Sequence, residues 1–453
     1  MLESLKRFHN VKSFREFFTL LTWQDIEKVA AIPLFLFLVS PFIFFWHVTI
    51  NKGWTFHMTI STIQLITFVL GATVLLCTFV KQRIEQFSLR SIAGDRMPQL
   101  LFLAMALLIL ISTLVNGFTS LALHGDSYRD ESVFSFWCYI LCYYGCASVI
   151  RSTRLKSVLF NAFLIGSTFI SAAALLDKAG ILSIWHFHFV QWEGTMAAVF
   201  YQYNHFAYYL LIAVMLSAVL ALYAESRVLQ LLYLQAFALH TATLVINGTR
   251  GCYLAVLCTL FLTFLLLLKT NRSRLKRFWI VLTVFVAASM TGILCNPGFI
   301  GRFSRLLMDF TNIIMQDEQA AYAGSHRWTL WKLTLGYIAE KPLLGWGTEG
   351  IGERLELESQ DNDRPHCEYL QYAAFYGIPT ALVYITALVS IFRKAWKQVK
   401  ELPPVSIAAL LTGAAYLISA VFGNTMFYTA PYPFIMLGLG FQSSLPDRAS
   451  AQK

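Results

Sequence analysis

The sequence predicts an all-α polytopic membrane protein. Of its 453 residues, 57% are hydrophobic and only 13% are charged. The mean hydropathy of the chain is +0.59, as expected of a protein that spans a membrane many times. Apolar runs of roughly twenty residues, the length that a helix needs to cross a bilayer core, recur along the chain. These three observations exclude a soluble globular protein.

Twelve apolar runs are candidate transmembrane helices, because each is close to the roughly twenty residues of a bilayer-spanning helix. They cover residues 29–50, 58–80, 97–116, 132–150, 157–176, 205–224, 228–247, 251–268, 278–295, 367–392, 405–423 and 427–445. Spans 1–9 therefore occupy residues 29–295, and spans 10–12 occupy residues 367–446, ahead of a cytoplasmic tail at 447–453.

Positive charge alternates between successive loops, which predicts the topology. Every second loop is rich in cations, namely Lys81, Arg83, Arg90, Arg96, Arg151, Arg154, Lys156, Arg227, Lys269, Arg272, Arg274, Lys276, Arg277, Arg393, Lys394, Lys397 and Lys400. The short loops between them hold only Lys52, Arg129, Lys178 and Arg250. Lysine and arginine accumulate on the cytoplasmic side of membrane proteins. We therefore expect a multi-pass protein of the cell (inner) membrane with both termini in the cytoplasm.

Residues 1–28 precede the first span and are basic and amphipathic. Apolar residues recur at helical spacing, with cations between them. The apolar residues are Phe8, Val11, Phe14, Phe17, Phe18 and Leu21, and the cations are Lys6, Arg7, Lys12 and Arg15. An apolar stripe flanked by cations is typical of a helix that lies on a membrane surface. We expect this segment to anchor the chain to the cytoplasmic face of the bilayer.

The sequence offers no pattern for a cofactor or a metal ion. It has no P-loop, and no glycine pattern of the dinucleotide type follows a predicted strand. No His/Cys cluster has the spacing of metal ligands, and the eight cysteines lie mostly within apolar spans. The net charge of +10 indicates cytoplasmic anchoring charge rather than nucleic-acid binding. We expect no cofactor, no metal and no nucleic-acid partner.

Residues 296–366 interrupt the hydrophobic pattern for about seventy residues, far more than a usual connection between helices. The predicted topology places this segment, between spans 9 and 10, on the extracytoplasmic side. It carries several arginines and histidines and a glycine-rich turn at 345–350. Long loops of this kind are usually functional. We therefore interpret residues 296–366 as a catalytic loop that acts on a substrate held by the spans.

Arg250 lies in the short connection between spans 7 and 8, in the sequence Asn247-Gly248-Thr249-Arg250-Gly251. It could extend to lipid headgroups, cap the preceding helix or bind an anion. The flanking glycines favour the anion, because they let the backbone approach a ligand closely. Arg250 is therefore a candidate for binding a phosphate group.

Arg327 is predicted to lie in the first turn of a helix that begins after Ser325, its expected N-cap, and stops near Lys341. Backbone N–H groups at a helix start favour an anion, and a guanidinium can grip phosphate with two hydrogen bonds. The alternative is a salt bridge to an acid of the same loop, such as Glu349 or Glu353.

His366 follows Arg364 and Pro365, so the chain before it is predicted to be extended. It begins span 10 at the membrane surface, where a neutral imidazole can accept a proton from a hydroxyl group. A purely structural role is the alternative. Arg302 and Arg305, at a spacing of three residues, are either pyrophosphate ligands or ordinary interfacial charges.

Two further polar residues, Asn204 and His205, lie at the start of span 6. They could touch a sugar or a pyrophosphate, or they could cap the helix. We keep them as weaker candidates for substrate binding.

Five motifs follow one another in a fixed order. They are Tyr203-Asn204-His205, Thr249-Arg250-Gly251, Arg327-Trp328-x-x-Trp331, the turn at 342–347, and His366-x-x-x-Leu370 with Gly377. This ordered set resembles the O-antigen ligase and O-antigen polymerase superfamily over about residues 200–445, and the twelve-span layout extends the resemblance to the whole chain. Cys367 departs from the asparagine that often follows the histidine in the family.

The resemblance implies a GT-C-type fold and a metal-independent, inverting glycosyltransferase of surface polysaccharide biosynthesis. Its donor would be a glycan on undecaprenyl pyrophosphate, transferred to an acceptor hydroxyl on the outer face of the membrane. By position in the motifs, His366 would be the catalytic histidine, and Arg250 and Arg327 would hold the pyrophosphate. Arg302 and Arg305 would be weaker candidates for the same role.

The acceptor is left open by the sequence. A ligase transfers the glycan to lipid A–core, a polymerase transfers it to another lipid-linked repeat, and a protein acceptor is a third choice. The many acids of residues 296–366 suit a highly anionic acceptor poorly, which favours the polymerase. A polysaccharide or lipid-linked oligosaccharide transporter or flippase is the alternative from another class. The chain has no inverted repeat and few charges within its spans, which argues against that alternative.

Overall fold

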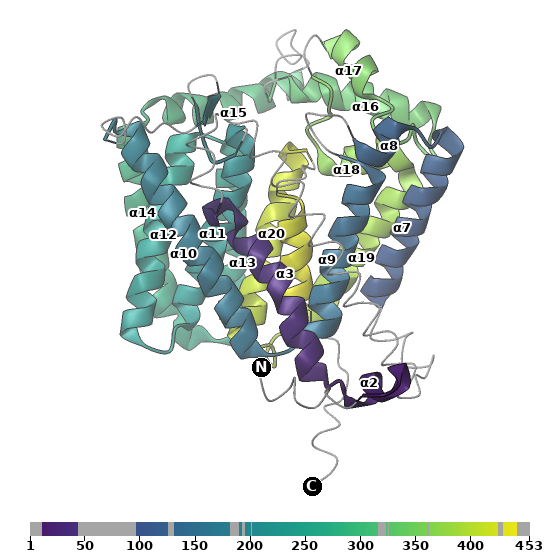
Figure 1. Cartoon of the computed structure of the whole chain (residues 1–453). Helices are drawn as coiled ribbons and strands as arrows, with labels where there is room; N and C mark the ends of the chain where they lie inside the picture. The colour runs from purple at the N-terminus through teal and green to yellow at the C-terminus, as the bar shows by residue number, and fades with distance from the viewer. Residues whose placement is uncertain are drawn as a thin grey trace.

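A computed structural model shows a bundle of long helices (Figure 1). The structure describes residues 11–43, 97–125, 131–181, 190–192, 195–200, 202–315, 323–324, 326–359, 362–424 and 429–441. Within these residues, nine helices are long and apolar enough to cross a membrane. The prediction of an all-α polytopic membrane protein is therefore confirmed. One small exception is an antiparallel hairpin of β1 (Val190–Trp192) and β2 (Thr195–Ala198).

The helices of membrane-spanning length follow the predicted spans closely. They are α3 (Trp23–Ile43), α7 (Met97–Asn116), α10 (Thr153–Lys178), α11 (Tyr203–Tyr223), α12 (Arg227–Asn247), α13 (Arg250–Thr270), α14 (Leu275–Cys295, extended at its start by η3, Arg272–Arg274), α19 (Ile378–Lys397) and α20 (Pro404–Ser419, continued by η5, Ala420–Phe422). The predicted span 132–150 is the shorter helix α9 (Val133–Val149). Of the predicted span 427–445, the structure describes α21 (Pro431–Gly440). The predicted span 58–80 lies outside the described residues.

The predicted span 367–392 was wrong as a single helix, because the chain breaks at Gly377 into α18 (Glu368–Tyr376) and α19. Gly377 adopts a φ of +86°, and a Cβ there would lie 2.1 Å from the carbonyl oxygen of Leu343. Ile378 N donates to Pro342 O at 2.8 Å on the other side of the break. Only glycine fits this close approach, so the 342–345 turn packs directly against the break.

The predicted surface helix at residues 1–28 is shorter in the structure. Helix α2 (Phe14–Leu20) begins at Ser13, whose hydroxyl accepts a hydrogen bond from Glu16 N. The first membrane helix, α3, begins at Trp23, so the last six residues of the predicted surface helix belong to it. Residues 1–10 lie outside the described residues.

The segment at 296–366 is largely helical rather than an irregular loop. It holds α15 (Gly298–Met315), α16 (Arg327–Glu340) and α17 (Gly352–Ser359). Helix α16 confirms the helix predicted to stop near Lys341. Figure 1 shows α15 lying across the upper end of the bundle, with α16 and α17 beside it. These helices cover the end of the bundle that is opposite α2.

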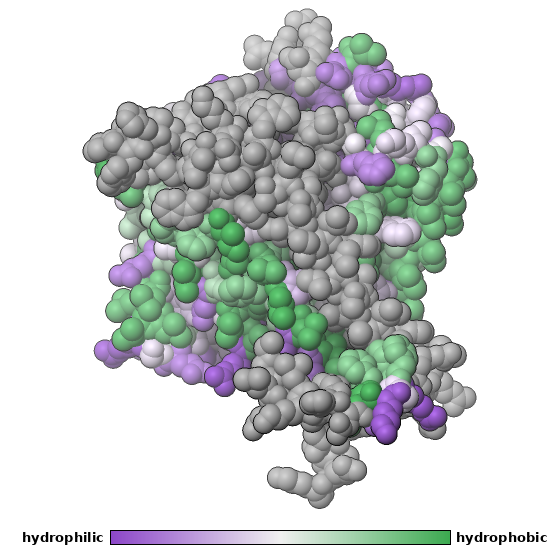
Figure 2. Space-filling view, viewed as in Figure 1, coloured by the Kyte–Doolittle hydropathy of each residue, from purple (hydrophilic) through white to green (hydrophobic). Residues whose placement is uncertain are grey.

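Two of the connections rich in cations contact each other. Arg274 and Arg277 each donate to the carbonyl oxygen of Leu222, at 2.7 and 3.2 Å, which joins the α13–α14 and α11–α12 connections. Figure 2 shows green apolar side chains at middle height on this face, and purple hydrophilic ones along the lower edge and at the upper right. An apolar belt between polar ends is what a bilayer-spanning protein requires.

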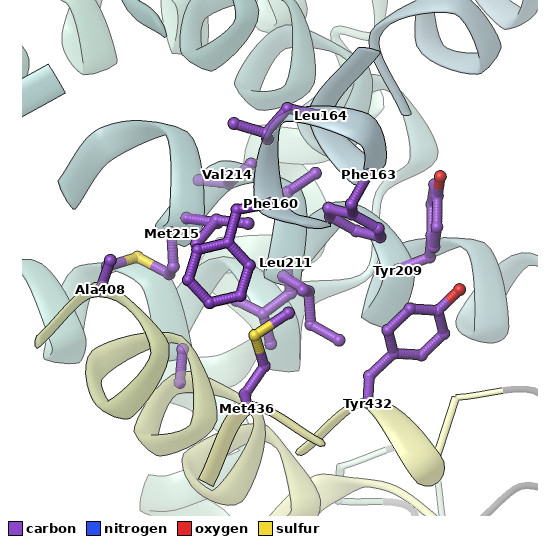
Figure 3. Packing of buried hydrophobic residues seen from close by; sticks show 14 of the residues in the cluster. Phe160, Phe163, Leu164, Tyr209, Leu211, Val214, Met215, Ala408, Tyr432 and Met436 are labelled. Atoms are coloured by element: carbon purple, nitrogen blue, oxygen red, sulfur yellow. The ribbon is translucent and has the colours of Figure 1, made fainter. Parts of the chain in front are cut away.

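Helix α11 lies at the centre of the bundle, and 94% of its most apolar 18-residue stretch is buried. It packs against α10, α12, α13 and α20. In the close view of Figure 3, Phe160 and Phe163 of α10 meet Leu211 of α11 and Met436 of α21. This core holds the start of α11 in a fixed place at the end of the bundle that α15 covers.

Candidate functional site

A cavity of about 540 Å³ lies where the start of α11, the α12–α13 turn, α15, the start of α16 and η5 meet. Most of its lining side chains are polar or charged. They are Thr195, Tyr203, Asn204, Tyr208, Thr249, Arg250, Cys252, Arg302, Arg305, Asp309, His326, Arg327, Ser419 and Phe422, with Gly248 and Gly251. All four arginines that the sequence suggested for a pyrophosphate therefore line one cavity.

The turn that carries Arg250 is held in place by hydrogen bonds within the protein. Gly248 ends α12 in the left-handed region at a φ of +84°, which favours glycine. Asn247 Nδ2 donates to the carbonyl oxygens of Met196 and Tyr203, at 2.9 and 3.0 Å. Arg250 is then the first residue of α13, and its side chain enters the cavity.

Helix α15 supplies the second side of the cavity. Arg302, Arg305 and Asp309 follow one another at spacings of three and four residues, which places them on one face of the helix. A Cβ on Gly248 would lie 2.9 Å from Arg302 Nη1, so the two elements touch. The predicted pair Arg302 and Arg305 is therefore part of a cavity wall.

Arg327 enters from the start of α16. The N-cap of this helix is His326, at a φ of +67° and with no side-chain capping bond, and not the predicted Ser325, which lies outside the described residues. Arg327 Nη1 donates to Gly324 O at 2.9 Å, and Gly324 N donates to Asp309 Oδ2 at 3.1 Å. The corner before α16 is thus tied to α15.

The cavity has a strong excess of positive charge. Four guanidinium groups face one carboxylate among its described lining residues, which leaves three positive charges in excess. The carboxylate, Asp309, lies 4.0 Å from Arg250 Nη1. Arg327 Nε is buried and makes no hydrogen bond with the described residues. Such a site suits an anion with several oxygen atoms, because guanidinium groups bind phosphate oxygens in pairs.

A comparison with known protein families agrees with this geometry. Residues 235–385 match the family model described as O-antigen ligase. This segment is similar to the O-antigen ligase family, which supports the resemblance to the O-antigen ligase and polymerase superfamily. A search of the curated proteins found no match. The matched segment contains Arg250, Arg302, Arg305, Arg327 and His366. The similarity supports a role in surface polysaccharide biosynthesis at a membrane.

The histidine of the O-antigen ligase motif, His366, is not among the residues that line the cavity. It is half-buried, adopts a φ of +50° and lies directly before α18. Helix α18 packs against α16, which carries Arg327, and against η5, whose Phe422 lines the cavity. His366 therefore lies outside the cavity lining, just ahead of a helix that adjoins two of the cavity walls.

Of the two weaker candidates at the start of α11, one lines the cavity and the other does not. Asn204 lines the cavity, and its Oδ1 lies 3.5 Å from Thr249 Oγ1. His205 is 1% exposed, faces the packed interior of the bundle and does not line the cavity. The structure thus brings Asn204, but not His205, to the arginines.

The sequence did not point to several of the residues that line the cavity. Tyr208 and Cys252 lie one helical turn or less beyond predicted positions, so the helical repeat alone was a usable signal. Ser419 and Phe422 come from the end of α20, and no local pattern marks them. The Phe422 ring stacks on Trp331 of the Arg327 motif, with centroids 6.3 Å apart.

Arg364, which directly precedes Pro365 and His366, does not face the cavity. It is 0% exposed and is surrounded by carboxylates. Burial lowers the pKa of Arg364, but the carboxylates of Glu349, Glu131 and Asp363 outweigh it and raise that pKa above its ordinary value. No group of three potential metal ligands occurs in the part of the chain that the structure describes.

Proposed function

We propose that this chain is a membrane glycosyltransferase that moves a glycan from undecaprenyl pyrophosphate to an acceptor hydroxyl on the outer face of the cell membrane. The observation that carries the proposal is the cavity lined by Arg250, Arg302, Arg305 and Arg327. The similarity of residues 235–385 to the O-antigen ligase family supports the class of substrate. The cavity supplies a place for the charged part of that substrate.

The pyrophosphate of the donor would occupy the cavity. When the glycan leaves, negative charge grows on the phosphate oxygen that held it. Preorganised guanidinium groups stabilise such charge without the need to reorganise at the moment of reaction. The reaction as proposed therefore needs no metal ion, because Arg250 and Arg327 neutralise the leaving group from two sides of the cavity.

His366 would act as the general base. The acceptor oxygen forms a bond with the anomeric carbon while its proton moves to the imidazole of His366. The bond between the anomeric carbon and the pyrophosphate oxygen breaks, and its electron pair leaves with the pyrophosphate. Attack from the side opposite to the leaving group inverts the anomeric centre. The position of His366 just before α18, the helix that packs against α16 and η5, supports an acceptor bound next to the cavity.

The charge of residues 296–366 does not decide between a lipid-linked repeat and lipid A–core as the acceptor. The acids of residues 296–366 favoured a polymerase when they were counted in the sequence. In the structure, Asp309 lies near Arg250, while Glu349 and Asp363 both pair with the buried Arg364. The segment is therefore less anionic towards a ligand than its composition indicates, and an acceptor with phosphate groups is compatible with it.

The test uses the purified full chain in lipid nanodiscs with a short glycan on undecaprenyl pyrophosphate and a second lipid-linked repeat as acceptor. We expect longer glycans and free undecaprenyl pyrophosphate to appear together in the absence of added divalent metal. A donor that stays intact with every acceptor offered, including lipid A–core, would contradict the proposal. Movement of intact donor between leaflets would then support the transporter alternative.

A further inference from the structure

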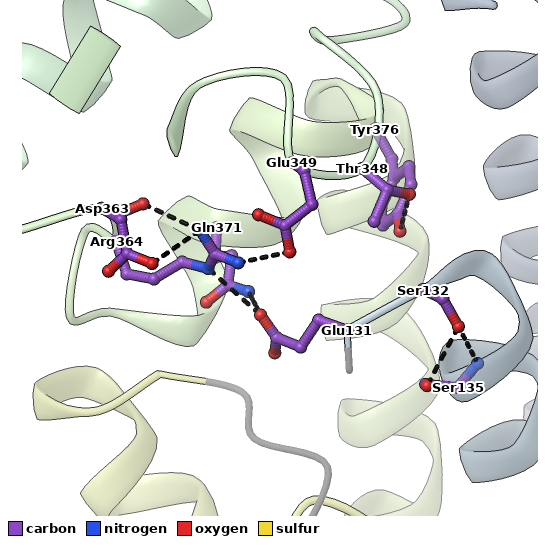
Figure 4. A network of polar contacts seen from close by, with 9 residues as sticks. All are labelled: Glu131, Ser132, Ser135, Thr348, Glu349, Asp363, Arg364, Gln371 and Tyr376. Carbon is purple, nitrogen blue, oxygen red and sulfur yellow. Dashed lines mark hydrogen bonds and ion pairs between the residues drawn. The ribbon is translucent and has the colours of Figure 1, made fainter. Parts of the chain in front are cut away.

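A buried cluster of charges lies beside the proposed catalytic histidine (Figure 4). Arg364 Nε donates to Glu131 Oε2 at 3.2 Å, and Arg364 Nη1 lies 3.3 Å from Asp363 Oδ2. Arg364 Nη2 donates a hydrogen bond to Glu349 Oε1. The side chains of Arg364 and Glu131 are 1% and 0% exposed, so the centre of this cluster is shielded from water. None of its residues lines the cavity.

The cluster joins three segments that are far apart in the sequence. Glu131 directly precedes the N-cap of α9, Glu349 lies in the glycine-rich turn, and Arg364 lies in the chain before α18. Gln371 Nε2 of α18 also donates to Glu131 Oε2, at 2.8 Å. Figure 4 shows these side chains converging on the guanidinium of Arg364. The arrangement fixes the 362–367 segment to the bundle.

Glu349 of the cluster and the nearby His366 have a backbone conformation that residues other than glycine rarely adopt. Glu349 has a φ of +66° and His366 a φ of +50°. A non-glycine residue in the left-handed region is strained, and it persists only where its surroundings hold it. Such strain is concentrated at functional sites. Arg364 of the cluster pairs directly with Glu349. It is connected to His366 through Pro365, whose ring restricts the backbone.

His366 is also anchored on its other side. Glu368, two residues later, is 1% exposed, and its Oε1 accepts a hydrogen bond from Tyr384 Oη at 2.8 Å. Arg364 and Glu368 therefore hold the chain two residues before and two residues after the histidine. The backbone of His366 is fixed from both directions by bonds made inside the bundle.

We propose that Arg364, Glu349 and Glu131 form a positioning unit that holds the His366 backbone and aims its imidazole at the acceptor hydroxyl. The inference rests on the proposed function, because it assigns the three residues to that reaction. A buried ion pair adds little net stability compared with apolar residues of the same size, since both charges lose their hydration. Specifying one conformation of the 362–367 segment is therefore the role that best explains this cluster.

The test compares Glu349→Gln with Glu340→Gln in the full chain. Glutamine keeps a hydrogen-bond acceptor near Arg364 Nη2 while it removes one charge. Glu340 is the matched control, because it pairs with Arg354 at 3.5 Å in the same part of the chain but is 55% exposed. Glycan transfer gives kcat and the donor KM, and hydrogen exchange reports on peptides that cover 362–367.

We expect Glu349→Gln to lower kcat by roughly 10- to 100-fold, the effect of a small displacement of a catalytic group. The donor KM and the affinity for inorganic pyrophosphate should stay unchanged, and exchange should increase only around 362–367. Glu340→Gln should behave as the unmodified chain. Normal kcat in Glu349→Gln would overturn the positioning role. Equal losses of kcat, pyrophosphate affinity and thermal stability would also overturn it, because they indicate a general structural role.

A milder variant guards against a failure to fold. Asp363→Asn changes the carboxylate of the cluster that is 29% exposed, and we expect a smaller fall in kcat with the same local rise in exchange. If the unmodified chain transfers no glycan in this assay, the proposed function is refuted. If that chain is active and both variants match it, only the positioning role is refuted.

Discussion

Arg250 Nη1 donates a hydrogen bond to the carbonyl oxygen of Arg302 at 2.9 Å. This bond links the start of α13, at the end of the bundle, to α15, which crosses over it (Figure 1). The same guanidinium lies 4.0 Å from Asp309. Arg250 is therefore oriented by the protein itself, and the ligand does not have to order it. Preorganisation of this kind lowers the entropic cost of binding.

Replacement of either opposed arginine should disable the cavity. We expect Arg250→Ala and Arg327→Ala each to lower kcat by about 10²- to 10³-fold, the usual effect of losing one preorganised donor to a developing oxyanion. Binding of inorganic pyrophosphate, measured by calorimetry, should weaken in both variants. Arg354→Ala is the control, since Arg354 is 49% exposed and lies outside the cavity lining. Unchanged pyrophosphate binding in both cavity variants would contradict this assignment.

Gly248 should be sensitive to the smallest side chain. In Gly248→Ala the new Cβ would lie 2.9 Å from Arg302 Nη1 at a φ of +84°, so the guanidinium must move and the backbone is strained by about 1–2 kcal/mol. We expect weaker pyrophosphate binding with a modest loss of thermal stability.

The matched control for this change is Gly336→Ala. Gly336 lies within α16, and a Cβ there meets nothing within 4 Å. Alanine in a helix interior should stabilise the chain by roughly 0.5–1 kcal/mol and leave binding unchanged. A Gly248→Ala chain that binds pyrophosphate normally would show that Arg302 does not contribute to the site.

Asp309 should limit the affinity of the cavity for anions, because it is the carboxylate among the described lining residues. In Asp309→Asn the competition for Arg250 is removed, while an amide oxygen still accepts from Gly324 N. An exposed ion pair is worth about 0.2–1 kcal/mol, so we expect pyrophosphate to bind up to roughly fivefold more tightly. Titration at low and at high salt checks this, since the gain should shrink as salt screens the charges. Weaker binding would indicate that the carboxylate instead holds Arg250 in place.

The fold was predictable where one segment carries its own pattern. Hydrophobic runs located the membrane helices. Arg250 stood out by its flanking glycines, and Arg327 by its place at the start of a predicted helix. The break at Gly377 was not predictable, since it depends on the close approach of Leu343 from another part of the chain. Ser419 and Phe422 were missed for the same reason, because packing of α20 brings them to the cavity.

The role of Arg364 shows a further limit of the sequence. The sequence showed only its place beside Pro365 and His366, because its partners Glu131 and Glu349 are distant in the chain. Whether a charge faces a substrate or a buried counter-ion depends on tertiary contacts that local spacing does not encode. The same contacts changed the interpretation of the acids in residues 296–366.

The two histidines near the site should differ in a way that identifies the base. His366 adjoins the cavity through α18, whereas His326 lines it at the start of α16. We expect His366→Ala to abolish transfer while pyrophosphate binding and thermal stability persist, because the imidazole acts on the acceptor and not on the leaving group. His326→Ala should weaken pyrophosphate binding and raise the donor KM with a smaller effect on kcat. Transfer and pyrophosphate binding, measured on both variants in the same nanodiscs, separate the two roles. If His366→Ala remains active and His326→Ala does not, the proton acceptor is His326, and the acceptor hydroxyl must bind within the arginine-lined cavity itself.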